Sequence, residues 1–161
     1  MIDPVELTSR LIRFDTVNPP GRERACSEHL AAILEAHGFA TELVAHEAGG
    51  GEPRASLVAR RGAAGKRKPI VLTGHIDVVP LGTRAWTRDP FGGEIADGRV
   101  HGRGSSDMKG GVAAMVAAAV AEAAALANGA EVVLVITAAV VDLSVKDGPV
   151  YPMLEDDIPL E

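Results

Sequence analysis

His75 and Asp77 stand two positions apart at the end of a short apolar run, in the segment TGHID (residues 73–77). Side chains two apart on a strand share a face, so the imidazole and the carboxylate are expected to point the same way. A histidine with a neighbouring carboxylate is a common metal arrangement, in which one ring nitrogen binds zinc and the carboxylate fixes the other N–H. A purely structural His–Asp pair is the alternative, and the spacing alone leaves both open.

A glycine-rich segment, GRGSSDMKGG (residues 102–111), holds a third candidate, Asp107. Glycines let the backbone approach a ligand closely. Asp107 also precedes an alanine-rich segment that is predicted to be a helix, so capping that helix is the alternative to a ligand role. A phosphate-binding loop is a weak interpretation, because the segment lacks GxxxxGK[ST] and the third glycine of GxGxxG.

The elements that must position these residues alternate along the chain. Apolar spacing predicts helices over residues 4–14, 22–37 and 108–126, and strands over 39–45, 55–59, 70–74 and 132–136. The runs at 70–74 and 132–136 are continuously apolar, which is typical of strands buried on both faces. The fold class predicted is α/β, a three-layer doubly wound sheet, in which ligands lie at the carboxyl ends of the strands.

Four further details are predicted from local sequence. Asp3 followed by Pro4 marks the start of the first helix. The helix over 108–126 has small residues on every side, which indicates burial all round. The long segment between Asp77 and Asp107 is expected to be a functional loop. We expect Arg103 to support this loop by hydrogen bonding.

Composition narrows the class of protein. The chain has 161 residues, of which 47% are apolar and 24% charged, which fits one globular domain. A net charge of −6 without a basic patch argues against nucleic-acid binding. No apolar run reaches the length of a membrane span and no signal segment opens the chain, so we expect a cytoplasmic protein with no membrane partner. The single cysteine, Cys26, is expected to be a small core residue.

Five segments together closely resemble the M20 metallopeptidase family, which includes acetylornithine deacetylase, succinyl-diaminopimelate desuccinylase, aminoacylase and carboxypeptidase G-type enzymes. They are DTVNPPG (15–21), TGHIDVV (73–79), Trp86, DPF (89–91) and GRGSSDMKGG (102–111). The resemblance covers about residues 3–139. It implies that residues 1–139 are the N-terminal part of a di-zinc exopeptidase-like catalytic domain.

The resemblance also implies roles for the candidate residues. His75 would bind one zinc ion, Asp107 would bridge two, and Asp77 would act as the catalytic residue that orients His75. The metal would be zinc, with cobalt as an alternative. The reaction would be metal-dependent hydrolysis of an amide bond, in an N-acyl amino acid or a small peptide, most like that of acetylornithine deacetylase. Intact members are often homodimers through an inserted domain, which would lie further downstream.

The sequence departs from the family at one functional motif. Members carry Thr-Ala-x-Glu-Glu, in which the first glutamate is the general base and the second a metal ligand, whereas residues 137–141 read TAAVV. Valine can neither take a proton nor coordinate a metal. Val140 and Val141 therefore predict that this chain is inactive and holds at most one zinc ion, weakly.

Residues 140–161 differ in composition from the rest. They contain no alanine, whereas residues 1–139 contain 26, and they carry −5 of the net charge of −6. We expect an atypical acidic, proline-containing tail and a truncated, frameshifted or fused family member. The alternative is a non-catalytic fragment or pseudo-enzyme that acts as a weak metal-binding or partner-binding module.

Overall fold

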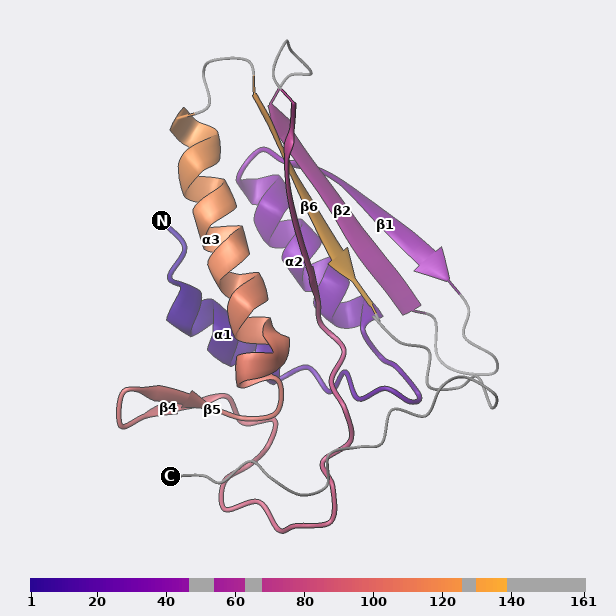
Figure 1. Ribbon diagram of the computed structural model, residues 1–161, viewed down its shortest axis with the longest axis vertical. Coiled ribbons are helices and arrows are strands. Elements are labelled where there is room, and N and C mark those ends of the chain that lie inside the picture. The colour runs from indigo at the N-terminus through magenta and orange to yellow at the C-terminus, as the bar shows by residue number, and fades with distance from the viewer. Residues whose placement is uncertain (47–53, 63–67, 126–129, 139–161) are drawn as a thin grey trace.

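The computed structural model describes residues 1–46, 54–62, 68–125 and 130–138. Within them, three helices pack on a four-stranded sheet, and a small hairpin lies to one side (Figure 1). The last residue of the helix predicted over 108–126 and the tail over 140–161 lie outside the described residues.

The sheet is mixed in direction. Its order is β1 (Ala40–His46), β2 (Arg54–Gly62), β6 (Glu131–Thr137) and β3 (Ile70–His75). The first three strands pair antiparallel, and β3 pairs parallel with β6. Helix α3 (Gly110–Ala125) connects β3 to β6, which is the crossover that a parallel pair requires. The α/β class predicted from the sequence is confirmed.

The first two helices form close to where the sequence predicts them. In α1 (Pro4–Ile12), the Asp3 carboxylate accepts a hydrogen bond from the Val5 amide (2.8 Å), as expected of an N-cap. The helix ends two residues before the predicted end at Phe14, because the amides of Arg13 and Phe14 turn back three residues instead of four. Helix α2 (Arg24–Ala36) buries Cys26 completely, which confirms that the cysteine is a core residue.

All three helices cover the same face of the sheet. One buried cluster joins residues of α1, α2 and α3 to alternate positions of β2 and β6, among them Leu11, Leu30, Leu57, Val116 and Leu134. Gly74 of β3 faces α3 so closely that a Cβ there would lie 2.7 Å from the Met115 methyl. The described residues therefore form two layers, one of strands and one of helices.

The environment of β3 differs from the prediction. In the described part of the sheet β3 is an edge strand, and Ile70 and Val71 are 55% and 56% exposed. The prediction that residues 70–74 are buried on both faces is wrong. Strand β6 lies between β2 and β3, and the prediction of a buried strand is confirmed there, with Val133 and Leu134 both buried.

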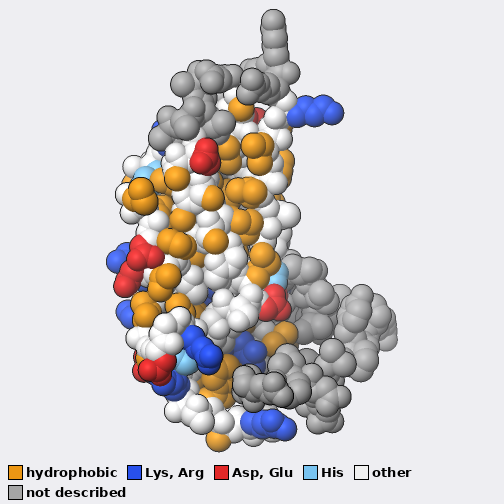
Figure 2. All heavy atoms as spheres, turned by 60° about the vertical axis from the view of Figure 1, so that its left-hand side comes forward, with side chains coloured by type: hydrophobic (Ala, Val, Ile, Leu, Met, Phe, Trp, Pro, Cys, Tyr) orange, Lys and Arg blue, Asp and Glu red, His pale blue; other side chains and the backbone are white. Residues whose placement is uncertain are grey.

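Helix α3 is buried on one side only. Val112 and Val116 pack in the core, whereas Ala114 and Ala118 are exposed, so the prediction of burial all round is wrong. Figure 2 brings this side of the molecule forward and shows hydrophobic side chains running along it. None of the described helices is both long and apolar enough to cross a membrane.

The long segment before Asp107 has structure of its own. It contains a hairpin of β4 (Glu94–Ala96) and β5 (Arg99–His101), joined at Asp97 and Gly98, which both have positive φ. An Asp-Gly pair is a strong signal for a two-residue hairpin turn, and the sequence analysis missed it. A wide turn, η1 (Ser105–Lys109), then leads into α3.

A buried ion pair joins the start of α2 to the sheet. Glu23 and Arg54 are 0% and 2% exposed and are joined by two hydrogen bonds of 2.9 Å, from Nε to Oε2 and from Nη2 to Oε1. Nη2 of Arg54 also donates to the carbonyl of Ala138, just beyond β6 (3.4 Å). One guanidinium thus links the start of α2, the start of β2 and the end of β6.

We predict that Arg54→Met lowers the free energy of unfolding by about 3–5 kcal/mol, because it leaves the Glu23 carboxylate buried and unpaired. Urea denaturation followed by circular dichroism measures the change. The control is Arg24→Met, which breaks the surface pair of Arg24 with Glu28 and should cost at most about 0.5 kcal/mol. Equal losses in the two variants would contradict the prediction.

Candidate metal site

The candidate site begins where β3 ends. His75 is the last residue of the strand and pairs in register with Thr137 of β6. The next residue, Ile76, is fully buried, and its amide still donates to the Thr137 carbonyl (3.2 Å). This anchor fixes the backbone between His75 and Asp77 at the carboxyl edge of the parallel pair.

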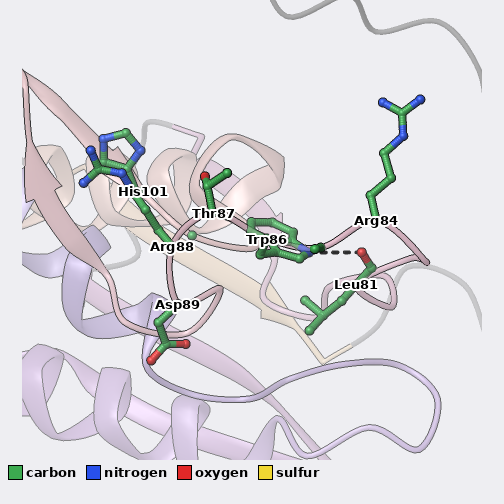
Figure 3. A pocket seen from close by; sticks show the side chains of 9 residues that line it. Leu81, Arg84, Trp86, Thr87, Arg88, Asp89 and His101 are labelled. Carbon is green, nitrogen blue, oxygen red and sulfur yellow. Dashed lines mark hydrogen bonds between the residues drawn. The ribbon is translucent and has the colours of Figure 1, made fainter.

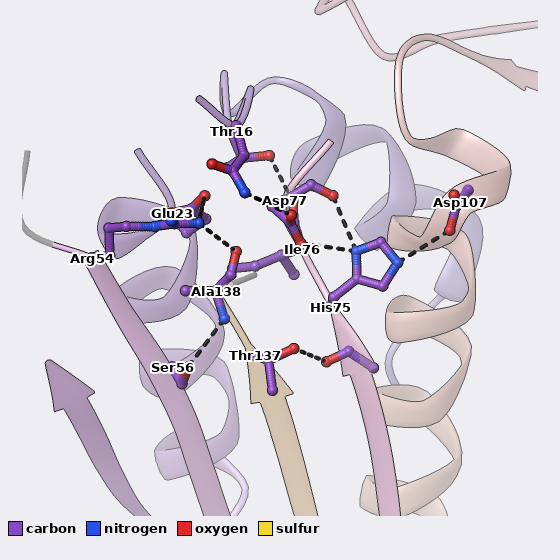
Figure 4. A network of polar contacts seen from close by, with 12 residues as sticks. Thr16, Glu23, Arg54, Ser56, His75, Ile76, Asp77, Asp107, Thr137 and Ala138 are labelled. Carbon is purple, nitrogen blue, oxygen red and sulfur yellow. Dashed lines mark hydrogen bonds and ion pairs between the residues drawn. The ribbon is translucent and has the colours of Figure 1, made fainter. Parts of the chain in front are cut away.

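The structure brings the three predicted residues together around one imidazole (Figure 4). Nδ1 of His75 lies 3.0 Å from Oδ1 of Asp77, and Nε2 lies 3.1 Å from Oδ1 of Asp107. The contact between His75 and Asp77 agrees with the expectation that their side chains lie on the same side of the chain. Asp107 joins them from 32 residues away along the chain, which sequence spacing alone did not predict.

Asp107 is not a helix cap. Its backbone is extended (φ −125°, ψ 97°), and α3 starts three residues later, so the capping alternative is wrong. Gly104, at φ +83°, opens the turn, and the Lys109 amide closes it on the Gly104 carbonyl (2.9 Å). The turn holds the Asp107 carboxylate outward, where it is 88% exposed.

These donors fit a metal ion of the zinc type. A carboxylate only accepts hydrogen bonds, and when Nδ1 donates to Asp77 a neutral ring turns its Nε2 lone pair toward Asp107. Two electron-rich atoms 3.1 Å apart need a cation between them, either a proton or a metal ion. Imidazole nitrogen and carboxylate oxygen are both zinc ligands. Asp77 stands behind the ring, as an orienting carboxylate does.

The donor set is short of a complete site. In the part of the chain that the structure describes, no group of three or more His, Cys, Asp or Glu side chains is arranged to hold an ion. The described residues supply two donors, His75 and Asp107, and structural zinc sites use four. We call His75, Asp107 and the supporting Asp77 the half-site.

Lys109 is the largest fully buried side chain next to the half-site. Its Nζ donates to the Phe14 carbonyl (2.8 Å) and so ties η1 to the end of α1. Burial lowers the pKa of Lys109 to about 8, although nearby Cys26, Asp15, Glu23 and Asp77 oppose the shift. A role for this lysine is not predictable from the sequence, because a hydrophilic residue type does not indicate burial.

Cys26 is not a reactive group. Burial raises the pKa of its thiol to about 12, with Lys109 opposing the shift and Glu23 adding to it. A thiolate is the nucleophilic form of cysteine, and this side chain is fully buried. The core interpretation made from the sequence therefore agrees with its environment.

A pocket of about 450 Å³ lies in the long segment, and none of the residues that line it belongs to the half-site. It is lined by Trp86, Arg84, Arg88, His101 and neighbouring residues. Arg88 is paired with Glu94 and Asp97, and Figure 3 shows Arg84 pointing away from the other labelled side chains. The Arg103 side chain donates to the Pro80 carbonyl (3.1 Å) and lies over Trp86, so it supports this segment as predicted.

Comparison with known proteins finds relatives of this sequence. Residues 71–139 match the family described as Peptidase family M20/M25/M40. The chain is 49% identical over 120 residues to a succinyl-diaminopimelate desuccinylase of Cereibacter sphaeroides, a match that covers 74% of this chain and 30% of that protein. A desuccinylase of a Wolbachia species from Brugia malayi is 42% identical over 120 residues, covering 74% and 29%. The chain spans about a third of the length of these curated relatives.

Solved structures show the same fold. A metallo-carboxypeptidase of the M20 family from Sulfolobus solfataricus superposes with a TM-score of 0.70 at 23% identity, covering 86% of this chain and 31% of that one. Human carnosine dipeptidase 1 gives 0.66 at 23% identity, covering 84% and 31%. The solved structures confirm the fold, and the family match and the desuccinylase relatives confirm the M20 resemblance predicted from the sequence, over the N-terminal part of the catalytic domain.

The buried lysine predicts a pH dependence of stability. The folded-state pKa of about 8 lies below the ordinary 10.5, so between these values the unfolded chain binds more protons and stability rises with pH. Relative to Lys109→Met, the wild-type free energy of unfolding should increase by about 1 kcal/mol from pH 7.5 to pH 9.

Denaturation at several pH values measures this difference. The upper limit of pH 9 keeps the opposing effect of Cys26 small, because its raised pKa removes stability mainly as pH rises from 9 toward 12. The control is Lys68→Met, at an exposed position, which should retain the wild-type rise. Parallel curves for wild type and Lys109→Met would contradict the prediction.

Proposed function

We propose that this chain carries one half of the metal site of an M20-type amide hydrolase, with His75 and Asp107 as metal donors. The observation that carries the proposal is the His75 imidazole held between two carboxylates, one partly buried and one exposed. Asp77 accepts the Nδ1 proton and keeps the Nε2 lone pair available. Asp107 presents its carboxylate to the solvent side of the same nitrogen.

The metal would supply water activation and carbonyl polarisation, the chemistry that zinc contributes to hydrolases. The residues of this chain hold and orient it. The ring plane of His75 is fixed by Asp77 and by the buried Ile76 between them. The wide turn around Asp107 leaves that carboxylate room to contact more than one metal ion, as a bridging role would require.

The substrate class proposed is a small N-acyl amino acid, with an N-succinyl group favoured over N-acetyl. Support comes from relatives of 42% to 49% identity that are named succinyl-diaminopimelate desuccinylase. Zinc is the proposed metal, with cobalt as the alternative. Structural relatives named as a carboxypeptidase and a dipeptidase keep small peptides as the next class of substrate.

A second candidate function is a weak metal-binding module without turnover. The described residues provide two donors, and valines stand at positions 140 and 141, where the family pattern carries the general base and a further ligand. Losing a general base typically costs 10²–10⁴ in rate. We propose that the 161-residue chain itself binds metal weakly without turnover, and that hydrolysis requires family members that carry both glutamates.

The half-site predicts specific losses of zinc affinity. In isothermal titration calorimetry, wild-type chain should bind a single zinc ion weakly, and His75→Ala and Asp107→Asn should each weaken binding by about tenfold or more. His101→Ala is the control, because that ring faces the Ala96 carbonyl and lines the separate pocket. Equal binding by wild type and His75→Ala would overturn the proposed site.

The two candidate functions differ in turnover. With zinc or cobalt present, release of succinate from N-succinyl-diaminopimelate and of acetate from N-acetylornithine should be undetectable for the wild-type chain. Turnover comparable with that of a full-length desuccinylase, lost in His75→Ala, would establish the hydrolase and refute the binding module.

The family motif predicts that one substitution raises the zinc affinity. Val141→Glu should tighten zinc binding by about tenfold, or about 1.4 kcal/mol, because it restores the carboxylate that the family uses as a ligand. Val140→Glu adds the same charge one residue earlier, at the position of the base, and should change the affinity less. Equal effects would show that added charge, and not a ligand at position 141, accounts for any gain.

A further inference from the structure

The Asp77 carboxylate is held from two sides. Oδ1 accepts the hydrogen bond from His75 (3.0 Å), and Oδ2 accepts one from Nδ2 of Asn18 (3.3 Å). Asn18 is 3% exposed, so its amide is withdrawn from water. The contacts run in series from Asn18 through Asp77 to His75, and Asn18 belongs to the DTVNPPG segment, which the proposed site has not used.

The backbone around Asn18 is fixed to the strand extension that carries Asp77. The Asn18 amide donates to the Val78 carbonyl (2.9 Å), and the Val78 amide donates to the Thr16 carbonyl (3.0 Å). Oγ1 of Thr16 donates to the Ile76 carbonyl (2.6 Å). Val17 and Val78 therefore form a parallel bridge, and Asp77 lies between two anchored neighbours, Ile76 and Val78.

The segment also rests on the buried ion pair. Gly21, at φ +82°, packs so closely on Arg54 that a Cβ there would lie 2.6 Å from Nε. The Gly21 amide donates to the Val17 carbonyl (2.9 Å), which closes the turn after Asn18. The Asn18 side chain is thus presented from a rigid base, and its position is not set by Asp77 alone.

We propose that Asn18 is a positioning residue for the half-site: it fixes the rotation of the Asp77 carboxylate so that Asp77 holds the proton of His75 on Nδ1 and leaves Nε2 available for a metal ion. The proposal rests on the proposed function, since the metal gives this orientation its purpose. A neutral amide suits the role, because a lysine or arginine there would compete with His75 for the carboxylate charge.

The role matters because His75 has two acceptors. Asp107 faces Nε2 at 3.1 Å, and a proton placed there would occupy the nitrogen that the metal needs. If the Asp77 carboxylate were free to rotate, the ring proton could move to the Asp107 side. Asn18 opposes that exchange by fixing Oδ2, so that Oδ1 stays directed at Nδ1.

Asn18→Leu removes the donor and keeps a similar shape in the buried site. Long-range ¹H–¹⁵N NMR of the His75 ring at pH 9 should show the Nδ1–H tautomer in wild type and a mixture of tautomers in Asn18→Leu. Zinc affinity measured by calorimetry should fall by about 3–10-fold, somewhat below the 10–100-fold typical of direct partners of a ligating histidine.

Thr16→Val is the matched control. It removes the hydrogen bond to the Ile76 carbonyl from the same segment but does not touch Asp77. It should lower stability and leave both the tautomer and the zinc affinity unchanged. An unchanged tautomer in Asn18→Leu, or an equal change in Thr16→Val, would overturn the proposal and make Asn18 an ordinary loop anchor.

Failure of the two proposals can be told apart. If wild-type chain binds no zinc, the metal function is refuted, and the tautomer of metal-free His75 still decides the role of Asn18. If zinc binds and its binding requires His75, but the His75 tautomer and the zinc affinity are the same in Asn18→Leu and wild type, only the positioning role is refuted.

Discussion

The buried pair of Glu23 and Arg54 is the constraint on which the carboxyl edge of the parallel strands β3 and β6 depends. Its guanidinium contacts the start of α2, the end of β6 at Ala138 and the turn at Gly21. Two ions removed from water gain little over apolar packing, but each becomes costly when its partner is lost. The pair therefore fixes geometry more than it adds stability, and the geometry it fixes is the edge where His75 emerges.

The half-site follows the same physical rule on a smaller scale. Each group that must point accurately is backed by a buried or partly buried neighbour: His75 by Asp77, Asp77 by Asn18, and the turn at Asp107 by Lys109. Lys109 lies buried at the cost of a lowered pKa. A short apolar side chain would pack there more cheaply, but it could not donate to the Phe14 carbonyl and join η1 to α1.

The sequence alone was sufficient to predict features that depend on residues close together in the chain. Asp3 and Pro4 marked the start of α1, and the spacing of His75 and Asp77 predicted a pair that the structure brings within 3.0 Å. It was insufficient where the answer depends on neighbours distant in the chain. The apolar run of β3 has the composition of a central strand, yet strand order leaves it at an edge of the described sheet. Asp107 reads as a helix cap, and only the turn geometry turns it toward His75.

The two carboxylates around His75 are chemically alike and differ in surroundings. Asp77 is largely enclosed and hydrogen-bonded on both oxygens, so it serves the ring and has little capacity left for an outside ligand. Asp107 is 88% exposed and contacts the ring through Oδ1, so its remaining lone pairs face solvent. Environment, not residue type, assigns one carboxylate to orientation and the other to ligand binding, as in other sites where paired acids take separate roles. A binding partner of His75, whether a metal ion or a proton, must therefore enter from the Asp107 side.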